Sequence, residues 1–313
     1  MTDSIVRAGN PVVCPVCHGP LDAAPNGLSC PSCGLDFVRN SAGYLRFPLE
    51  AGGADEQSER LDAYAAHQAS SAPRLYAEFL NAYVASEPVN RLLDAGCGAG
   101  EIPALFASDG VDAFGVDLPK ASGFWRAAGL DPDRFFAADV SELPFADGAF
   151  DVVLSLGVIE HIGTVTGHCT LAPDYAARRL RFARELMRVT RQGGRILIAC
   201  PNKSFPVDIH HGPSDAASQA GRLRTSMHRR TGLNFHRTWG RYHLVSYPEL
   251  RHLFVDGAAA ASIRTVPARG YFGYGSAGGG GFRRTISRAY VEHLPASVRH
   301  TFLNPFVLAE IRR

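Results

Sequence analysis

Several features that often reveal the class of a protein are missing from this sequence of 313 residues. It contains no run of about 18 apolar residues, and no basic segment followed by an apolar stretch opens it, so membrane spanning and secretion both lack a signal. We therefore expect a cytoplasmic protein. Hydrophobic residues form 46% of the chain and charged residues 20%, a composition that can bury the core of one large domain and a small accessory unit.

Lysine is also scarce, since Lys120 and Lys203 are the only two among 32 basic residues. The charges are unevenly distributed along the chain. Residues 1–177 carry 9 basic and 23 acidic groups, whereas residues 178–313 carry 23 basic and 7 acidic groups. This asymmetry fits a surface for an anionic partner, but a general preference for arginine over lysine explains it equally well.

Four of the seven cysteines follow a metal-binding pattern within CPVCHGPLDAAPNGLSCPSCG. They form two C-x2-C pairs: Cys14, Cys17, Cys30 and Cys33. Each pair can place two thiolates on one side of a tetrahedral Zn²⁺, and four thiolates leave no open position, so we expect a structural zinc ribbon. A cytoplasmic location disfavours disulfides. The other three cysteines are scattered and are expected to be small buried residues: Cys97, Cys169 and Cys200.

Short apolar runs alternate with helical segments from residue 91 onward, which indicates βαβ units and a parallel sheet covered on both faces. The expected strands are RLLDA, DAFGVD, RFFAADV, FDVVLSL and RILIAC, with two more in ASIRTVPARGYFGYG and NPFVLAEIRR. The fold class is therefore α/β. We expect the ribbon over 1–48, a linker with helices over 49–90, and the sheet domain over 91–313, with an insertion at 202–246.

The segment LLDAGCGAGEIPALFASDG places three glycines between a strand and a helix. Gly96, Gly98 and Gly100 allow a tight turn in which the backbone approaches a ligand at the helix N-terminus. The dinucleotide pattern G-x-G-x-x-G is missing, because Glu101 stands where its third glycine should be, and no G-K-[ST] follows as in a P-loop. Acidic residues beside the loop disfavour phosphate and favour a cationic nucleoside.

Three acidic residues end consecutive strands of the expected sheet. Asp94 ends the first strand, Asp117 ends the second, where it can accept both ribose hydroxyls, and Asp139 ends the third, where it can accept an exocyclic amine. Each alone could be a helix cap or a loop carboxylate, but together they mark the edge where open α/β sheets bind ligands. The other residues expected to bind the cofactor are Cys97, Leu118, Val140 and Leu156.

With these residues the sequence resembles the class I S-adenosylmethionine-dependent methyltransferases, in particular those of type 11, over about residues 90–202. LLDAGCGAG looks like their first motif, VDL like their ribose-binding acid, and ADVSELPFADGAFDVVLSLGVIEHI like their third and fourth motifs. RVTRQGGRILIACPN is similar to their fifth strand and its entry. The resemblance implies a Rossmann-like seven-stranded sheet of order 3-2-1-4-5-7-6 with an antiparallel last strand, and S-adenosyl-L-methionine as cofactor. The amino-terminal ribbon resembles the zinc ribbon of several such methyltransferases, including a ribosomal-RNA guanine methyltransferase.

Two groups of residues are candidates for activating the methyl acceptor. Glu160 and His161 follow the fourth strand in GVIEHIG, beside the expected methyl position, where His161 could take a proton from a hydroxyl. Asp208, His210 and His211 lie in FPVDIHHGPSD of the insertion and could act as a base with its orienting carboxylate, or bind a metal. Plain loop capping for the first group and a surface loop for the second stay open as alternatives.

The quinone-biosynthesis O-methyltransferases, which look similar at Glu160 and His161, bind a divalent metal through an E-x-x-E-H pattern. In this chain Gly157 stands where the first glutamate should be. That departure puts a catalytic metal in doubt, although the second glutamate and the histidine are present.

The expected helix over 175–191 carries four arginines on one face: Arg181, Arg184, Arg188 and Arg191. Such a stripe is usually solvated, but it could also dock RNA, an acidic carrier protein or a second subunit. We expect methylation of a small molecule, at a hydroxyl of a natural product, a sugar or a lipid-linked precursor. The alternative is an rRNA or tRNA methyltransferase. The ribbon and the basic second half favour it, whereas the lack of a recognisable RNA-binding module and of an N-P-P-Y motif disfavours it.

Overall fold

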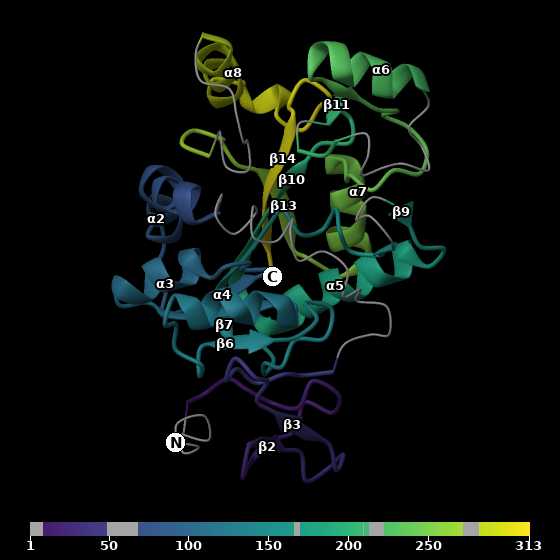
Figure 1. Cartoon of the computed structure of the whole chain (residues 1–313). Helices are drawn as coiled ribbons and strands as arrows, with labels where there is room; N and C mark the ends of the chain where they lie inside the picture. Colours follow the sequence, from purple (N-terminus) through teal and green to yellow (C-terminus); the bar gives the residue numbers. More distant parts are fainter. Residues whose placement is uncertain (1–8, 49–67, 166–169, 209, 213–221, 272–281) are drawn as a thin grey trace.

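The computed structural model describes residues 9–48, 68–165, 170–208, 210–212, 222–271 and 282–313 (Figure 1), so Cys169 lies outside the described residues. A seven-stranded sheet occupies its centre and consists of β4 (Arg91–Ala95), β5 (Asp112–Asp117), β6 (Phe135–Ala137), β7 (Phe150–Leu156), β10 (Thr190–Pro201), β13 (Ser262–Thr265) and β14 (Phe306–Arg312). The strand order is β13-β14-β10-β7-β4-β5-β6, and β14 alone runs antiparallel to both its neighbours. This is the order 3-2-1-4-5-7-6, so the predicted α/β fold is confirmed.

The strands lie close to the apolar runs of the sequence. The strands β4, β5 and β7 coincide with RLLDA, DAFGVD and FDVVLSL. In contrast, β10 begins before its apolar run, because Thr190 already pairs with Phe150 of β7 and the register then shifts before Arg195. β6 is shorter than its run and ends at Ala137, after which Asp139 begins a turn closed by the Glu142 amide.

Side chains of the central strands alternate between two hydrophobic layers, as the period of two in a strand requires. Leu93 and Val153 pack in the layer covered by α5 (Tyr175–Val189), α7 (Tyr247–Arg251) and the π-helical η4 (His252–Gly257). Leu92 and Val152 pack in the opposite layer, which is covered by η1 (Tyr76–Leu80), α2 (Asn81–Val84), α3 (Glu101–Ser108) and α8 (Phe282–Glu292). The predicted covering of both sheet faces is therefore confirmed.

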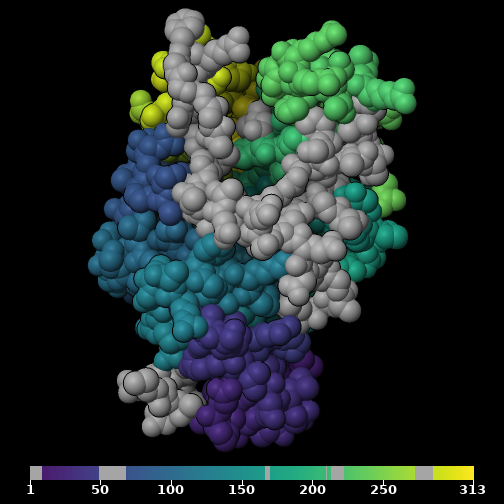
Figure 2. All heavy atoms as spheres, viewed as in Figure 1, coloured from purple at the N-terminus to yellow at the C-terminus, as the bar shows by residue number. Residues whose placement is uncertain are grey.

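The amino-terminal segment forms a small antiparallel sheet of β1 (Asp22–Ala24), β2 (Gly27–Ser29) and β3 (Asp36–Val38). It joins the edge of the central sheet at β6, since the Phe47 amide donates to the Ala137 carbonyl and the Ala137 amide donates to the Leu45 carbonyl, both at 2.9 Å. Phe47 also packs between Phe37 and Phe136, with ring centroids 4.9 and 6.2 Å apart. The ribbon thus shares a hydrophobic core with the sheet, and Figure 2 shows its purple atoms directly against the teal region.

The segment after β10 carries β11 (Val207–Asp208), α6 (Arg222–Thr231) and β12 (Asn234–Phe235), with β11 and β12 paired antiparallel. Its two ends meet at the sheet, where the Lys203 amide donates to the Val245 carbonyl at 3.2 Å. Figure 1 shows α6 and α8 at the end of the molecule remote from the ribbon. The remaining short elements are η2 (Pro119–Ala121), α4 (Ser122–Ala127), β8 (Thr164–Val165), β9 (Thr170–Leu171) and η5 (Ala296–Val298).

Within the part of the chain that the structure describes, no helix has the length and apolar character needed to cross a membrane.

Candidate active site

A glycine-rich loop joins β4 to α3 at the carboxyl edge of the sheet. Gly96 and Gly98 adopt left-handed backbone conformations, with φ of 97° and 54°. A Cβ atom would lie 2.3 Å from Val158 Cγ2 at the first position and 2.2 Å from Gln68 Oε1 at the second. Only glycine permits both this backbone conformation and the close approach of Val158 and Gln68 to the loop.

Two side chains that the sequence did not single out hold this loop in place. Gln68 is 5% exposed, and its Oε1 accepts a hydrogen bond from the Ala99 amide at 2.9 Å. Trp125 is fully buried, and its Nε1 donates to the Gly98 carbonyl at 2.7 Å. The Trp125 ring packs edge-to-face on Tyr44 of the ribbon segment, with the centroids 5.2 Å apart. A glutamine and a tryptophan within helical segments give no sequence signal for this role.

Three acidic side chains surround the loop: Asp94, Glu101 and Asp117. Asp117 accepts hydrogen bonds from the Gly98 amide at 2.6 Å and from the Leu118 amide at 2.7 Å. Burial, followed by the nearby charges of Asp117 and Glu101, raises the pKa of Asp94 to about 8. Burial also raises the pKa of Asp117 and of Glu101. No salt bridge to these three carboxylates occurs within the described ranges, so the loop suits a cationic ligand.

The other predicted pocket residues lie around the same edge of the sheet. Asp139 follows β6, and its Oδ1 accepts a hydrogen bond from the Ser141 amide at 2.7 Å. Leu118 is 43% exposed beside Asp117, whereas Val140, Leu156 and Cys97 are buried. Burial raises the pKa of the Cys97 thiol well above its ordinary value, so this cysteine is a neutral buried residue, as is Cys200.

A second group of side chains lies beyond the ends of β7 and β10. We call it the carboxylate–histidine cluster, and its members are Glu160, His161, Asp208, His211 and His243. One oxygen of Glu160 and one ring nitrogen each of His161 and His211 lie within 4.8 Å of one another, and the same holds for Asp208, His211 and His243. The structure therefore brings members of both predicted acceptor groups together. Their link to the glycine loop is Val158, which packs against Gly96.

Asp208 is the best-connected member of the cluster. It accepts hydrogen bonds from the amides of His210 and His211 at 3.1 and 3.0 Å, and its two oxygens lie 3.1 and 3.2 Å from His211 Nδ1. Tyr242 donates its hydroxyl to Asp208 at 3.3 Å, and His243 Nε2 lies 3.4 Å away. Burial alone would raise the pKa of Asp208, but the contacts with His211 and His243 outweigh it and hold this pKa below its ordinary range.

Glu160 differs from Asp208 because one of its oxygens is not satisfied. Its side chain is 2% exposed, burial raises its pKa to about 7, and Oε2 is buried without a hydrogen-bond partner. The nearby Arg179 is buried too, but it donates to the backbone carbonyls of Ile162 and His243. Neither Arg179 nor His243 was among the predicted site residues. Burial lowers the pKa of His243 to about 4.

His210 lies in the same segment as His211 but belongs to neither group of converging ligand atoms. Its ring packs against Phe306, with the centroids 5.7 Å apart, and is 6.4 Å from the ring of His211.

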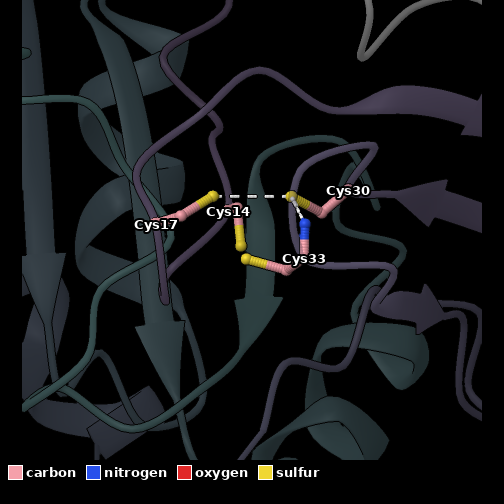
Figure 3. Close-up of side chains that lie close together, drawn as sticks. All are labelled: Cys14, Cys17, Cys30 and Cys33. Carbon is pink, nitrogen blue, oxygen red and sulfur yellow. Dashed lines mark hydrogen bonds between the residues drawn. The ribbon is translucent and has the colours of Figure 1, made fainter.

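The four ribbon cysteines form a separate thiolate cluster (Figure 3). Their sulfur atoms all lie within 4.8 Å of one another, and Cys17 Sγ is 3.5 Å from Cys30 Sγ. Four sulfurs around one Zn²⁺ at about 2.3 Å lie roughly 3.8 Å apart, so the arrangement fits this ion. All four cysteines are free thiols rather than disulfides.

Three arginines of the predicted stripe lie on α5, but the helix ends at Val189 and Arg191 lies in β10, where the chain already pairs with β7. All four arginines make contacts within the chain. Arg188 binds Glu185, Asp147 and the carbonyls of Leu143 and Phe145. The other three contact Glu142, the Gly257 carbonyl and Asp151, in the order Arg181, Arg184 and Arg191. Intramolecular contacts thus account for much of the stripe's charge.

Comparisons with known proteins match this chain to methyltransferases. Residues 93–198 match a family model described as a methyltransferase domain. A demethylmenaquinone methyltransferase of Beutenbergia cavernae is 36% identical over 118 residues, which cover 36% of this chain and 42% of that protein. A methyltransferase of a Mycobacterium species, strain JLS, is 32% identical over 145 residues, which cover 46% of this chain and 52% of that protein. The chain thus spans about half the length of these curated relatives, or less.

Among solved structures, a TehB-like S-adenosylmethionine-dependent methyltransferase from Corynebacterium glutamicum superposes with a TM-score of 0.47 and 14% identity. The alignment covers 82% of this chain and all of that structure. The strand order and the glycine loop at the carboxyl edge agree with the match of residues 93–198 to the methyltransferase domain family.

Proposed function

We propose that this protein is an S-adenosyl-L-methionine-dependent methyltransferase whose acceptor is a small molecule methylated at a hydroxyl group. The observation that carries the proposal is the set of acids around the glycine loop, with Asp94 buried and Asp117 partly buried, which have no cationic side chain beside them in the described part of the chain. A sulfonium nucleoside supplies that missing positive charge. The glycine loop lies at the carboxyl edge of the sheet, where open α/β sheets bind nucleosides.

Each predicted cofactor residue has a role in this proposal. Asp117, which the Gly98 and Leu118 amides already orient, would accept the ribose hydroxyls. Asp139 would accept the adenine amine, and Leu118 and Val140 would pack on the ring. The glycine loop and Asp94 would hold the methionine part of the cofactor. Cys97 and Leu156 would shape the wall of this pocket from below.

The carboxylate–histidine cluster would receive the acceptor beside the loop. A sulfonium methyl group is already electrophilic, so the chain mainly has to align the acceptor oxygen with the methyl carbon and exclude water. The new C–O bond forms as the C–S bond breaks, the bonding electrons stay on sulfur, and the hydroxyl proton leaves. Glu160, His161, Asp208 and His211 are proposed to position the acceptor and assist loss of this proton.

The thiolate cluster is proposed to bind a structural zinc ion. All four thiolates would be used, so this ion has no position for a substrate. The ribbon over 1–48 would then act as a support for the sheet edge at β6 rather than as a second active site.

An RNA acceptor is the second candidate, and α6 is the observation that favours it. Arg229 and Arg230 are exposed on this helix, and Trp239 nearby in the chain is 71% exposed. Cations and aromatic rings are the groups that bind phosphates and bases. RNA binding that weakens steeply with salt would favour this alternative, because phosphate contacts release counterions.

Calorimetry with S-adenosyl-L-methionine and S-adenosyl-L-homocysteine tests the main proposal, followed by a turnover assay with a panel of hydroxyl-bearing small molecules. Asp117→Asn should weaken cofactor binding by about 100-fold, since it disturbs two charge-assisted hydrogen bonds of about 1.5 kcal/mol each. Asp36→Asn, on the exposed surface of β3, is the matched control and should bind normally. Failure of the folded wild-type chain to bind either nucleoside would refute the assignment.

A further inference from the structure

Three side chains of the carboxylate–histidine cluster present the ligand set of a metal site. One Glu160 oxygen and one ring nitrogen each of His161 and His211 converge within 4.8 Å. The two histidine rings meet nearly at right angles, with centroids 5.3 Å apart and an interplanar angle of 74°. Two imidazoles and one carboxylate, with positions left open, are typical of divalent zinc and of first-row transition metals.

The state of Glu160 is a second observation that points to a cation-binding site. Its Oε2 atom is buried without a hydrogen-bond partner, although the side chain is only 2% exposed. An unsatisfied buried carboxylate oxygen is costly, and a bound cation removes that cost. Arg179 does not do so directly, because its guanidinium donates to the carbonyls of Ile162 and His243.

His211 is held in the orientation that a metal ligand requires. Its Nδ1 lies 3.1 and 3.2 Å from the two oxygens of Asp208, so this carboxylate fixes the orientation of the ring. Histidines that bind metals commonly donate their second ring nitrogen to a carboxylate in this way. Asp208 also accepts the amides of His210 and His211 and the hydroxyl of Tyr242, so its oxygens are already used.

The alternative ligand group, Asp208 with His211 and His243, fits a catalytic ion less well. The side chains of Asp208 and His243 are fully buried, with 0% exposure each, so an ion there would have no access to an acceptor. Glu160 is also buried, but His161 and His211 are each partly exposed. Access to an acceptor therefore favours the group that contains Glu160.

We propose that Glu160, His161 and His211 bind a divalent transition metal ion, with Asp208 as the positioning residue of His211. The role of this ion rests on the proposed function: it would bind the acceptor hydroxyl oxygen and lower its pKa. The ion keeps its oxidation state. The hydroxyl proton passes to water, and the C–O bond forms as the C–S bond to the cofactor breaks.

Metal analysis of the full chain tests the site without any need for turnover. We expect Co²⁺, added to protein that already holds zinc in the thiolate cluster, to bind as a second equivalent with the absorption of nitrogen and oxygen ligands and no thiolate charge-transfer band. Glu160→Gln and His211→Asn should abolish this second equivalent and leave the zinc content unchanged. His252→Asn is the matched control, since His252 contacts Asp256 at 2.8 Å in an exposed pair and should not matter.

Asp208→Asn separates the positioning role from simple ligation. It keeps all three ligands but removes the charged partner of His211, so the affinity for Co²⁺ should fall by about 10- to 100-fold, the usual effect of losing such a partner. Absence of a second equivalent in the wild type, or its persistence in Glu160→Gln and His211→Asn, would overturn the proposed site.

The catalytic role fails separately from the proposed function. If the protein that holds only the thiolate zinc binds the cofactor and methylates an acceptor at the same rate as the fully loaded protein, the role of the ion is wrong while the proposed function stands. If Co²⁺ binds as expected but the cofactor does not, the metal site stands and the proposed function fails.

Discussion

The thiolate cluster and the carboxylate–histidine cluster solve different problems with similar numbers of side chains. The thiolate cluster comes from one short stretch of chain, presents four identical side chains and lies in the ribbon that extends the sheet at β6. The carboxylate–histidine cluster draws on the loop after β7 and on the segment after β10, and it contains both a saturated carboxylate, Asp208, and an unsatisfied one, Glu160. One arrangement is closed and suits support, whereas the other is open and suits chemistry.

The difference shows where each cluster obtains its geometry. Two tight C-x2-C turns position the four sulfurs, and the shared core of Phe37, Phe47 and Phe136 anchors them to the sheet. The positions of the histidine rings instead depend on two neighbouring parallel strands. Because β7 and β10 end at the same edge of the sheet, the segments that follow them come together. The geometry of the thiolate cluster therefore depends mainly on its own segment of the chain. The geometry of the carboxylate–histidine cluster depends on the central sheet, which brings its two segments together.

Disruption of the thiolate cluster should have the largest effect on stability of the changes considered. A small effect would contradict the supporting role assigned to this cluster. Cys30→Ser should lose the zinc ion and lower the melting temperature sharply, since structural zinc contributes on the order of 10 kcal/mol to the folding of small zinc domains. Because Cys30 is 1% exposed within the core shared with the sheet, we expect the unfolding to include the β6 edge. Thermal unfolding with metal analysis measures this effect. Val16→Ser, at an exposed site between two ligands, should behave as the wild type, and a Cys30→Ser protein with unchanged melting would contradict a supporting role.

The sequence predicted the sheet well because each central strand is an apolar run of the right length between turn residues, as RLLDA and FDVVLSL show. The clustering of the four cysteines could also be predicted, because the C-x2-C spacing by itself indicates two tight turns. The sequence also placed Asp94, Asp117 and the glycines at one edge of the sheet, because parallel strands bring their carboxyl ends together.

Other parts of the site were beyond that reasoning. Trp125, Gln68, Arg179 and His243 reach their positions through tertiary packing, and no local pattern marks them. The meeting of His161 with His211 likewise depends on the path of the insertion, which has no clear period in the sequence. Glu160 and Asp208 could be named as candidates, but only the structure shows that one carboxylate is satisfied and the other is not.

The pH dependence of cofactor binding tests whether the glycine loop and the carboxylate–histidine cluster act separately. The pKa of Asp94 is raised to about 8 by burial and then by Asp117 and Glu101, so its carboxyl is largely protonated at neutral pH without a ligand. A cation binds the ionised form, hence affinity for S-adenosyl-L-methionine should rise by up to about tenfold per pH unit below pH 8 and then level off.

The sign of this linkage has a second consequence in the ligand-free protein. The folded state binds the Asp94 proton more tightly than the unfolded state, so this group should reduce the free energy of unfolding as pH rises from the ordinary carboxyl range to about 8. Calorimetry across pH in wild type, Asp94→Asn and His211→Asn measures the binding effect. Asp94→Asn should lose the slope and His211→Asn should keep it; a slope that disappears in His211→Asn would show that the two regions are not separate.

Trp125→Phe should give the smallest effect. It tests whether the ribbon, through Tyr44 and Trp125, influences cofactor binding at the glycine loop. The substitution keeps the aromatic contact with Tyr44 but removes the Nε1 donor of the 2.7 Å bond to the Gly98 carbonyl, so the loop loses one of its fixed points. A hydrogen bond of about 1 kcal/mol predicts roughly fivefold weaker binding of S-adenosyl-L-homocysteine, with the zinc content unchanged. Trp239→Phe is the matched control, because this ring is 71% exposed. Equal affinities in the two variants would mean that the ribbon supports the sheet without influencing the glycine loop. The ribbon and the candidate active site would then act independently.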